Sequence, residues 1–514
     1  MLLCGRLLNL STTSTSVAYL TSTRVREIAH TRGMIYDRNL KPLVNKDYTY
    51  TFLLKPTQSN LSLLKAMGYE GDVIERLQGG SLVIIESDNK HLFTEGTDIK
   101  ALRVFKRYRD PLCVHVIGYT DEDGNGISGI EEHFNSYLTE TGGDLSVAYS
   151  ADANGRLLTA EAIEIRNQNY YTAEGLVLTI DSDIQRIVEN ALKSNNVKKG
   201  AVVVLDTESG GIAGCASVPC YDPENPAEAL SSTDSPFINR CFSAYPVGSV
   251  FKLVTAVGAL ENGINLPLYT CTGQITKSGN TFNCSKLKGH GETDLAGAIS
   301  QSCNPYFIEL GTRLGGKSLL VTAETTGFGR PIDLGNGYLT NSGILPDITD
   351  LNSDAAVGNF AFGQGRFTAT PLQVAAFINT IATDGIYKEP YLVRGYTDSK
   401  GAFAPIITDS PYRIFEKDTC RVLKKAMLST TIDGTGTLAF SSLFNSCGKT
   451  ATAQSGQYDN TGREIKICWY AGFFPAKNPR YTLCIMVEDG TSGGTDCAPL
   501  FKEICENIYI QSLK

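Results

Sequence analysis

The sequence predicts an α+β fold with an antiparallel sheet, preceded by a smaller mixed α+β region. Three observations lead to this class. The composition is globular, since 42% of the 514 residues are apolar and 19% are charged. Strand patterns occur near residues 200–218 and again near residues 467–487, with helical patterns between them. The length predicts two or three domains, and no internal repeat or low-complexity segment is present.

The elements of the first region are short and alternate between strand and helix patterns. We expect a strand at residues 48–55, short helices at 61–67 and 71–77, strands within 100–119 that end in Val114–Gly118, and a helix at 130–138. Three glycines, at positions 124, 126 and 129, predict a loop before that helix. No catalytic cluster is evident in this region.

The second region begins where the composition changes near Leu176. Residues 176–180 have a strand pattern, and Asp181 or Ser182 can cap a helix over residues 184–192. The turn signal Thr207-Glu208-Ser209-Gly210 predicts a β-hairpin. Its strands cover residues 200–206 and 211–218, and further elements are expected as strands at 467–474 and 481–487 and a last helix at 498–511. Strands at both ends with helices between them indicate an α+β domain.

Charge and cysteine usage exclude several function classes. The net charge of −8 argues against a nucleic-acid partner, because phosphate contacts need a basic surface. The 14 cysteines include no Cys-x-x-Cys pair, and the five histidines include no His-x-x-x-His pair, so we expect no zinc site and no metal or cofactor. Cys271 and Cys284 could form a disulfide bridge, and most other cysteines are expected to be buried free thiols.

The first ten residues are apolar apart from Arg6 and Asn9, and a run of hydroxyl side chains follows them. This stretch is too short for a spanning helix of about 20 residues. It also lacks a clear signal-peptide pattern. A third possibility is the end of a membrane anchor whose beginning is missing, and residues 1–31 are interpreted as such a remnant or as a linker.

Ser249 and Lys252 form the first of three strings that could carry out serine acyl transfer. An apolar stripe over residues 250–262 predicts a helix, which puts Ser249 at its N-terminus. Backbone N–H groups there favour a developing oxyanion, and a desolvated lysine three positions on can accept the proton of the serine. The alternative is an N-cap serine followed by a surface lysine. Ser-x-x-Lys also occurs at Ser62/Lys65, Ser87/Lys90, Ser285/Lys288 and Ser446/Lys449.

Ser302 and Asn304 form the second string, between an amphipathic stretch and Pro305. A loop between two helices fits this context. The hydroxyl could relay a proton to a leaving group, and the amide could hold a substrate amide. The alternative is a pair of helix-capping residues.

Lys449 opens the third string, after Gly448. The residues that follow alternate, so Thr450 and Thr452 would face one side of a strand and Lys449 the other. An edge strand of this kind can pair with an extended peptide and bind its terminal carboxylate. An ordinary exposed strand is the alternative. Lys277-Ser278-Gly279 fits a Lys-[Ser/Thr]-Gly pattern better, but it lies between the first two strings, and the strand context of Lys449 favours the later string.

With these strings in order, the chain resembles the class B penicillin-binding proteins, which are peptidoglycan DD-transpeptidases. The resemblance extends along nearly the whole chain. The motifs that carry it lie at residues 32–39 (RGMIYDRN), 115–119 (HVIGY), 129–131 (GIE), 178–181 (LTID) with Gln185, 245–249 (YPVGS), 363–365 (GQG) and 370–373 (TPLQ). It implies a dimerisation or pedestal domain over residues 32–174. It also implies a transpeptidase domain over residues 175–514, with an antiparallel five-stranded sheet flanked by helices.

The resemblance also implies a role for each candidate residue. Ser249 would be the nucleophile and Lys252 the base, with Ser302 and Asn304 as a second catalytic pair. Lys449 and Thr450 would bind the substrate carboxylate, and Gly448 and Thr452 would make further substrate contacts. The backbone N–H groups of Ser249 and Thr452 would form the oxyanion hole. The implied substrates are stem peptides ending in D-Ala-D-Ala, and β-lactams would acylate Ser249. A membrane glycosyltransferase of the SEDS type is the implied partner, with the catalytic domain outside the cytoplasmic membrane of a bacterium.

Two departures from the family pattern keep other functions open. Ala451 replaces the usual glycine and adds a methyl group where the substrate backbone passes. The membrane anchor expected before Arg32 is absent or incomplete. The alternatives are a β-lactamase-like hydrolase or penicillin sensor, and a non-catalytic scaffold of cell division or sporulation.

Overall fold

The computed structural model describes residues 22–96, 98–264, 266–408 and 410–513. The chain forms two compact units, which are described separately. Unit 1 comprises Met1–Met34, Val44–Arg109 and Ser136–Glu174, and unit 2 comprises Ile35–Leu43, Asp110–Asn135 and Gly175–Lys514. The anchor remnant expected at residues 1–31 lies outside the described residues as far as position 21, and residues 22–31 form a strand.

Unit 1 contains two antiparallel three-stranded sheets. One has the order β1 (Ser22–Thr31), β6 (Gly143–Ala151), β7 (Glu164–Gln168), and the other β4 (Val83–Ser87), β3 (Asp47–Leu54), β5 (Ile99–Lys106). Helices α2 (Gln58–Ala66) and α3 (Asp72–Gln78) pack on the second sheet through Leu64 and Ile74, which share a core with Phe52. The predicted strand at 48–55 and both short helices are confirmed.

The strand predicted to end at Val114–Gly118 is wrong. Residues Val114–Ile117 form a single helical turn, α4, in which Gly118 N donates to Val114 O at 2.7 Å. Cys113 and Gly118 flank the turn with positive φ angles of 44° and 86°. A short apolar run fits a buried strand and a buried helical turn equally well, so its pattern alone could not decide. The helix predicted at 130–138 is divided into α5 (Gly129–His133) and α6 (Asn135–Glu140).

Unit 2 is built on a five-stranded antiparallel sheet, as expected. Its order is β10 (Ile212–Val218), β9 (Gly200–Asp206), β23 (Tyr481–Glu488), β22 (Glu464–Phe474), β21 (Cys447–Tyr458). The predicted hairpin is β9–β10, and Cys215 pairs with Val203 within it. Among the described residues β22 is the one strand that pairs with β21, so β21 is an edge strand of the sheet with its other edge unpaired, as the sequence predicted.

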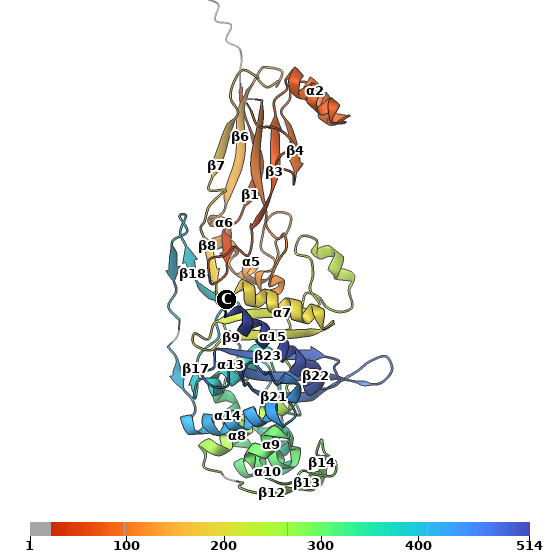
Figure 1. The fold of residues 1–514 in the computed structure, drawn as a ribbon, viewed down its shortest axis with the longest axis vertical. Coiled ribbons are helices and arrows are strands. Elements are labelled where there is room, and N and C mark those ends of the chain that lie inside the picture. The colour runs from red at the N-terminus through yellow and green to blue at the C-terminus, as the bar shows by residue number, and fades with distance from the viewer. Residues whose placement is uncertain (1–21, 97, 265, 409, 514) are drawn as a thin grey trace, which may run out of the picture. The chain divides into compact units, whose positions relative to one another are not determined.

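Helices cover both faces of this sheet (Figure 1). On one face, α7 (Ser182–Ser194) and α15 (Ala498–Gln511) pack on Val202, Leu483 and other buried residues. On the other face lies α13 (Pro371–Ala382), where Thr482 Oγ1 donates to Asn379 Oδ1 at 3.0 Å. Alternate residues of β23 thus point to opposite helical layers, as the strand period of two requires.

The remaining elements of unit 2 complete the helical side and several small sheets. The helices are α8 (Lys252–Glu261), α9 (Leu295–Ser300), α10 (Asn304–Leu314), α11 (Gly316–Thr325), α12 (Asp354–Ala361) and α14 (Lys417–Ile432). Strand β18 (Val393–Thr397) pairs with both β8 (Gly175–Leu178) and β19 (Phe403–Pro405). The two-stranded sheets are β11 (Tyr245–Pro246) with β16 (Thr368–Ala369), β12 (Tyr269–Cys271) with β15 (Gly291–Thr293), β13 (Gln274–Lys277) with β14 (Asn280–Asn283), and β17 (Ile386–Tyr387) with β20 (Tyr412–Arg413). Strand β2 (Met34–Tyr36) lies beside β8.

Two motifs of the resemblance have structural roles in unit 2. Asp37 is fully buried and accepts hydrogen bonds from Ser182 Oγ at 2.7 Å and from the backbone N–H of Lys41 at 2.8 Å. Gln185 is also fully buried and exchanges two hydrogen bonds with the backbone of Cys215, at 2.7 and 2.9 Å. These side chains connect the start of α7 to neighbouring segments, so both have a structural role and need no catalytic explanation.

Candidate active site

Ser249 lies in a tight turn that precedes helix α8. The turn, Gly248–Phe251, is a 3-10 helix, so the helix predicted over residues 250–262 begins more tightly than expected. Gly248 N donates to Gly363 O at 3.0 Å, and a Cβ on Gly363 would lie 2.0 Å from Gly248 O. Only glycine allows this approach of two backbones. The approach fixes the turn and leaves Ser249 half-buried.

Aromatic side chains pack against this turn and stabilise it. The ring of Phe251 lies 4.6 Å from that of Phe360 and 4.5 Å from that of Phe367, measured between centroids. Trp469 Nε1 of the sheet donates to Pro246 O at 2.9 Å, just before the turn. The buried rings anchor the side chain that follows the serine by two positions, so the serine backbone has little freedom.

Lys252 is fully buried and uses three hydrogen bonds. Its Nζ donates to Ser302 O at 2.8 Å, to Ser302 Oγ at 3.1 Å and to Asn304 Oδ1 at 2.6 Å. Burial lowers the pKa of the Lys252 amine to about 7, because desolvation disfavours the ammonium form. The first two candidate strings therefore meet at one buried amine with an accessible neutral form.

The Ser302 loop joins α9 to α10, as the sequence predicted. Ser302 has a positive φ of 55°, which is uncommon for a residue with a side chain. Cys303 is the N-cap of α10, and Asn304 is its first residue. Asn304 Nδ2 donates to Asn283 O at 3.0 Å, so its amide bridges Lys252 and the last residue of β14.

Lys449 lies near the start of the open-edged strand β21 and is fully buried. Its Nζ donates to Thr450 O at 2.9 Å. Burial, followed by the charge of Lys252, lowers the pKa of the Lys449 amine. The role of Lys449 in binding the substrate carboxylate stays a prediction.

The two threonines of the third string have partners that the sequence did not reveal. Thr450 Oγ1 lies 2.6 Å from Thr435 Oγ1, and Gly493 N donates to Thr452 Oγ1 at 3.2 Å. Thr435 N in turn donates to Ser300 O at 3.0 Å. No sequence pattern singled out Thr435, which lies in a loop, or Gly493, which begins the short π-helix Gly493–Cys497. Gly448 lies against Tyr470, whose hydroxyl would be 2.1 Å from a Cβ at position 448.

The structure thus brings the three strings together. Lys252 contacts both Ser302 and Asn304, and its charge reaches Lys449. The Ser249 turn packs on β21, where a Cβ on Gly248 would lie 3.2 Å from the Ala453 Cβ. Among the described residues no hydrogen bond joins the Ser249 hydroxyl to Lys252, whose three protons are directed to Ser302 and Asn304.

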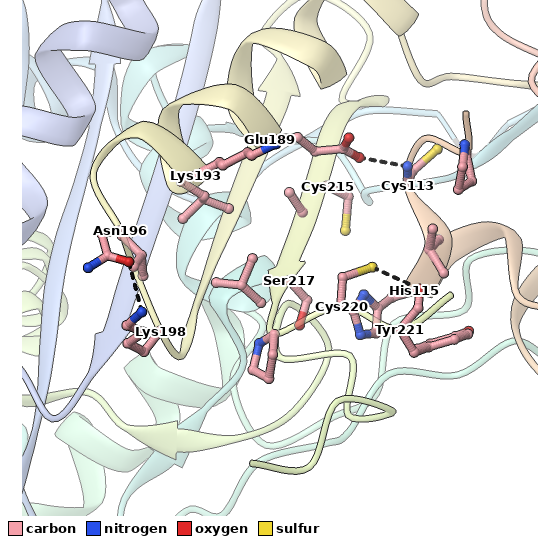
Figure 2. Close-up of a pocket in the computed structure, with 17 residues that line it drawn as sticks. Cys113, His115, Glu189, Lys193, Asn196, Lys198, Cys215, Ser217, Cys220 and Tyr221 are labelled. Atoms are coloured by element: carbon pink, nitrogen blue, oxygen red, sulfur yellow. Dashed lines mark hydrogen bonds between the residues drawn. The ribbon is translucent and has the colours of Figure 1, made fainter. Parts of the chain in front are cut away.

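A cavity of about 480 Å³ also lies in unit 2, away from these strings (Figure 2). Its lining comes from α7, β10 and residues 111–115. Two of the ionisable side chains there have hydrogen-bond partners. Glu189 accepts from Cys113 N at 2.7 Å, and His115 Nε2 bonds to Pro236 O at 2.6 Å. None of the three candidate strings contributes to the lining.

One expectation about the cysteines is wrong. Cys271 and Cys284 are both free thiols, and they form a group with His290 and Cys303. The four donor atoms lie within 4.8 Å of one another, although the sequence predicted no set of metal-ligating residues. The chain order conceals this group, because no two of its members are closer than six positions.

Residues 200–506 match a protein-family model that is described as the penicillin binding protein transpeptidase domain. The chain belongs to this family. Among its relatives, this class B penicillin-binding protein is 29% identical over 515 residues to stage V sporulation protein D of Bacillus subtilis, with 92% of this chain and 77% of that protein covered. It is 28% identical over 414 residues to peptidoglycan D,D-transpeptidase FtsI of Escherichia coli K12, with 77% and 65% covered. The chain thus spans less than two thirds of FtsI.

Solved structures share the fold of this penicillin-binding protein. One is penicillin binding protein 3 from Mycobacterium tuberculosis, complexed with ampicillin, with a TM-score of 0.68, 22% identity and coverage of 95% of this chain and 96% of that chain. Another is the complex between PBP2 and MreC from Helicobacter pylori, with a TM-score of 0.68, 24% identity and coverage of 96% and 100%. Within the described residues, no helix has both the length and the apolar character to cross a membrane.

Proposed function

We propose that this class B penicillin-binding protein is a serine-type D,D-transpeptidase that cross-links peptidoglycan stem peptides through an acyl ester on Ser249. The observation that carries the proposal is the buried Lys252 amine, whose pKa is lowered to about 7 and whose partners are Ser302 and Asn304. Lys252 lies one helical turn beyond Ser249, and the turn that holds Ser249 packs on β21 at Ala453. A serine acyltransferase needs a nucleophile, a base and a substrate-binding edge in this arrangement.

The neutral Lys252 amine is the proposed base. With a pKa of about 7, roughly half of the amine is neutral at pH 7 and can accept the Ser249 proton. The Ser302 hydroxyl lies 3.1 Å from the amine and can pass that proton on to the leaving nitrogen. Asn304 holds the amine on its other side at 2.6 Å.

The open edge of β21 is the proposed binding surface for the donor peptide. An extended peptide can add to such an edge through main-chain hydrogen bonds. The hydroxyls of Thr450 and Thr452 are then the contacts for its terminal carboxylate, and the buried Lys449 acts on that carboxylate through its positive potential. The backbone N–H groups of Ser249 and Thr452 would form the oxyanion hole, and Gly448 would border the peptide.

The proposed reaction has two balanced steps. Ser249 Oγ attacks the carbonyl carbon of the penultimate D-Ala, the C–N bond breaks, and D-Ala leaves with the proton that the serine lost. The amine of a second stem peptide then attacks the ester, a new C–N bond forms, the C–O bond breaks, and the proton that this amine loses passes to Ser249. If water takes the place of that amine, the same site is a carboxypeptidase.

The first unit and the partners belong to the same proposal. Residues 32–174 would serve as a pedestal that contacts a membrane glycosyltransferase of the SEDS type, with the catalytic domain outside the cytoplasmic membrane. Two of the solved relatives are described as a complex with ampicillin and a complex with MreC. Their names support β-lactam acylation of Ser249 and an envelope partner for this chain.

Labelling with a fluorescent penicillin tests the proposal. The full chain should form a covalent adduct that is lost in Ser249→Ala and strongly slowed in Lys252→Ala. The matched control is Ser62→Ala, because Ser62 belongs to another Ser-x-x-Lys string, on the exposed side of α2. Persistent labelling of Ser249→Ala would overturn the assignment. A long-lived adduct supports a transpeptidase, rapid turnover a β-lactamase-like hydrolase, and no adduct at all a non-catalytic scaffold.

A further inference from the structure

The group formed by Cys271, Cys284, His290 and Cys303 has no role in the reaction described above. Its four donor atoms lie within 4.8 Å of one another, and Cys284 Sγ is 3.5 Å from His290 Nδ1. Cys271 and Cys284 are each 2% exposed and Cys303 is fully buried, whereas His290 is half-buried. Three thiols and an imidazole facing one point form the donor set of a structural zinc site.

The part of the chain around this group has no apolar core. Residues 267–293 form two small two-stranded sheets, β12–β15 and β13–β14. Within these residues the only buried positions are Cys271, Gly273, Cys284 and Gly289. A segment of this size cannot bury enough apolar surface to be stable alone and needs a disulfide or a metal. The cysteine group is therefore the candidate for the stabilising interaction that an apolar core would otherwise provide in this segment.

Glycine backbones bring the thiols together. Cys284 N donates to Gly273 O at 2.8 Å. Gly273 has a φ angle of +97°, and a Cβ there would lie 2.0 Å from Leu287 O. Gly289 has a φ angle of +80°, and a Cβ there would lie 2.1 Å from Cys271 O. Both positions therefore require glycine, and the two loops converge closely enough for the side chains of Cys271 and Cys284 to meet.

We propose that Cys271, Cys284, His290 and Cys303 bind one Zn²⁺ ion with tetrahedral geometry. Thiolate and imidazole ligands favour zinc over the harder Mg²⁺ and Ca²⁺, which take oxygen ligands. Zn–S bonds of about 2.3 Å place tetrahedral ligands about 3.8 Å apart, which small movements of these donors would reach. Binding releases the thiol protons, since the ligand is the thiolate.

The metal site is joined to the catalytic loop at two points. Cys303 lies between Ser302 and Asn304 in the chain, so a metal bond to its sulfur restrains both neighbours. Asn304 Nδ2 also donates to the carbonyl oxygen of Asn283, the residue before Cys284. Zinc would thus fix the loop whose two side chains hold Lys252, and the four ligands are positioning residues for the proposed reaction. The metal site itself does not depend on that reaction.

Metal content of the purified full chain is the first test. Zinc bound after gel filtration without chelator should be about one ion per chain by inductively coupled plasma mass spectrometry. Cys271→Ser and His290→Gln should each lower this content by about tenfold or more. The matched control, Cys420→Ser, removes a buried thiol on α14 outside the group and should retain the zinc.

Substitution with Co²⁺ keeps the proposal falsifiable if a variant fails to fold. The reduced wild-type chain should take up Co²⁺ with the absorption bands of tetrahedral thiolate coordination, and added Zn²⁺ should remove them. Zinc removal should also slow penicillin acylation and be reversed by added Zn²⁺. The proposal is overturned if the reduced chain binds neither metal. It is equally overturned if thiol counting and peptide mapping find a stable disulfide within the group, because a bridge uses two of the ligands.

Discussion

Lys252 Nζ donates to Asn304 Oδ1 at 2.6 Å, which joins the first turn of α8 to the first turn of α10. The acceptor is a neutral amide, so it satisfies one proton of the buried amine without adding a negative charge. A carboxylate in the same place would favour the ammonium form. The choice of asparagine therefore keeps Lys252 able to act as a base near neutral pH.

Acylation of Ser249 should depend on pH through Lys252. Burial lowers the pKa of this amine to about 7, and only the neutral form accepts a proton. The second-order rate constant for penicillin acylation should therefore rise as pH increases through about 7 and level off above about 8. Stopped-flow measurements across this range would check it. A rate that falls as pH rises through 7 would exclude Lys252 as the base.

Asn304→Asp should move this pH profile upward. The new carboxylate would lie next to Lys252 and raise the pKa of its amine by about 1–3 units. At pH 7 the acylation rate should fall, and much of it should return at higher pH. Asn507→Asp on the exposed side of α15 is the control and should leave the profile unchanged. Equal loss of rate at every pH would mean that the substitution disrupts the loop rather than the pKa of Lys252.

The sequence predicted those elements that have long, regular patterns. The hairpin β9–β10, the helix α7 with its Asp181 cap and the last helix α15 lie where the periods placed them. The run Val114–Ile117 was assigned wrongly because three apolar residues and one histidine, all buried, carry no period. The 3-10 turn at Gly248–Phe251 was missed because its geometry comes from the approach of Gly363, which is distant in the chain.

For the candidate site, too, the sequence predicted the residues that lie in short local strings and missed those that only the fold brings together. Ser249, Lys252, Ser302, Asn304 and Lys449 could be named because each lies in a short string. Thr435 could not, since only the fold brings its hydroxyl 2.6 Å from that of Thr450. The cysteine group was missed for a similar reason: its members come from separate loops, and positive-φ glycines rather than close spacing bring the loops together.

Thr435→Val tests whether this contact orients Thr450 for carboxylate binding. The substitution removes the hydroxyl that bonds to Thr450 Oγ1 and to Ser300 O, while the shape of the side chain is retained. Loss of the hydrogen bond that orients Thr450 should weaken the initial penicillin complex about 2- to 10-fold, with the first-order acylation step nearly unchanged. Thr461→Val in the β21–β22 turn is the matched control. A drop confined to the first-order step would place Thr435 in the chemistry instead.

Ala451→Gly should produce two opposite effects. The residue lies in β21, is 4% exposed, and pairs with Trp469 of β22. Glycine in a strand interior should lower the free energy of unfolding by about 0.5–1 kcal/mol. Removal of the methyl group should also give an extended substrate more room along the open edge, so acylation by penicillins with bulky side chains should become faster.

Chemical denaturation and acylation rates on the same preparations separate these effects. Ala471→Gly, in the neighbouring strand β22 and fully buried, is the matched control: it should show the stability loss without the gain in rate. If Ala451→Gly acylates no faster than the wild-type chain with any penicillin, the methyl group does not limit access to Ser249.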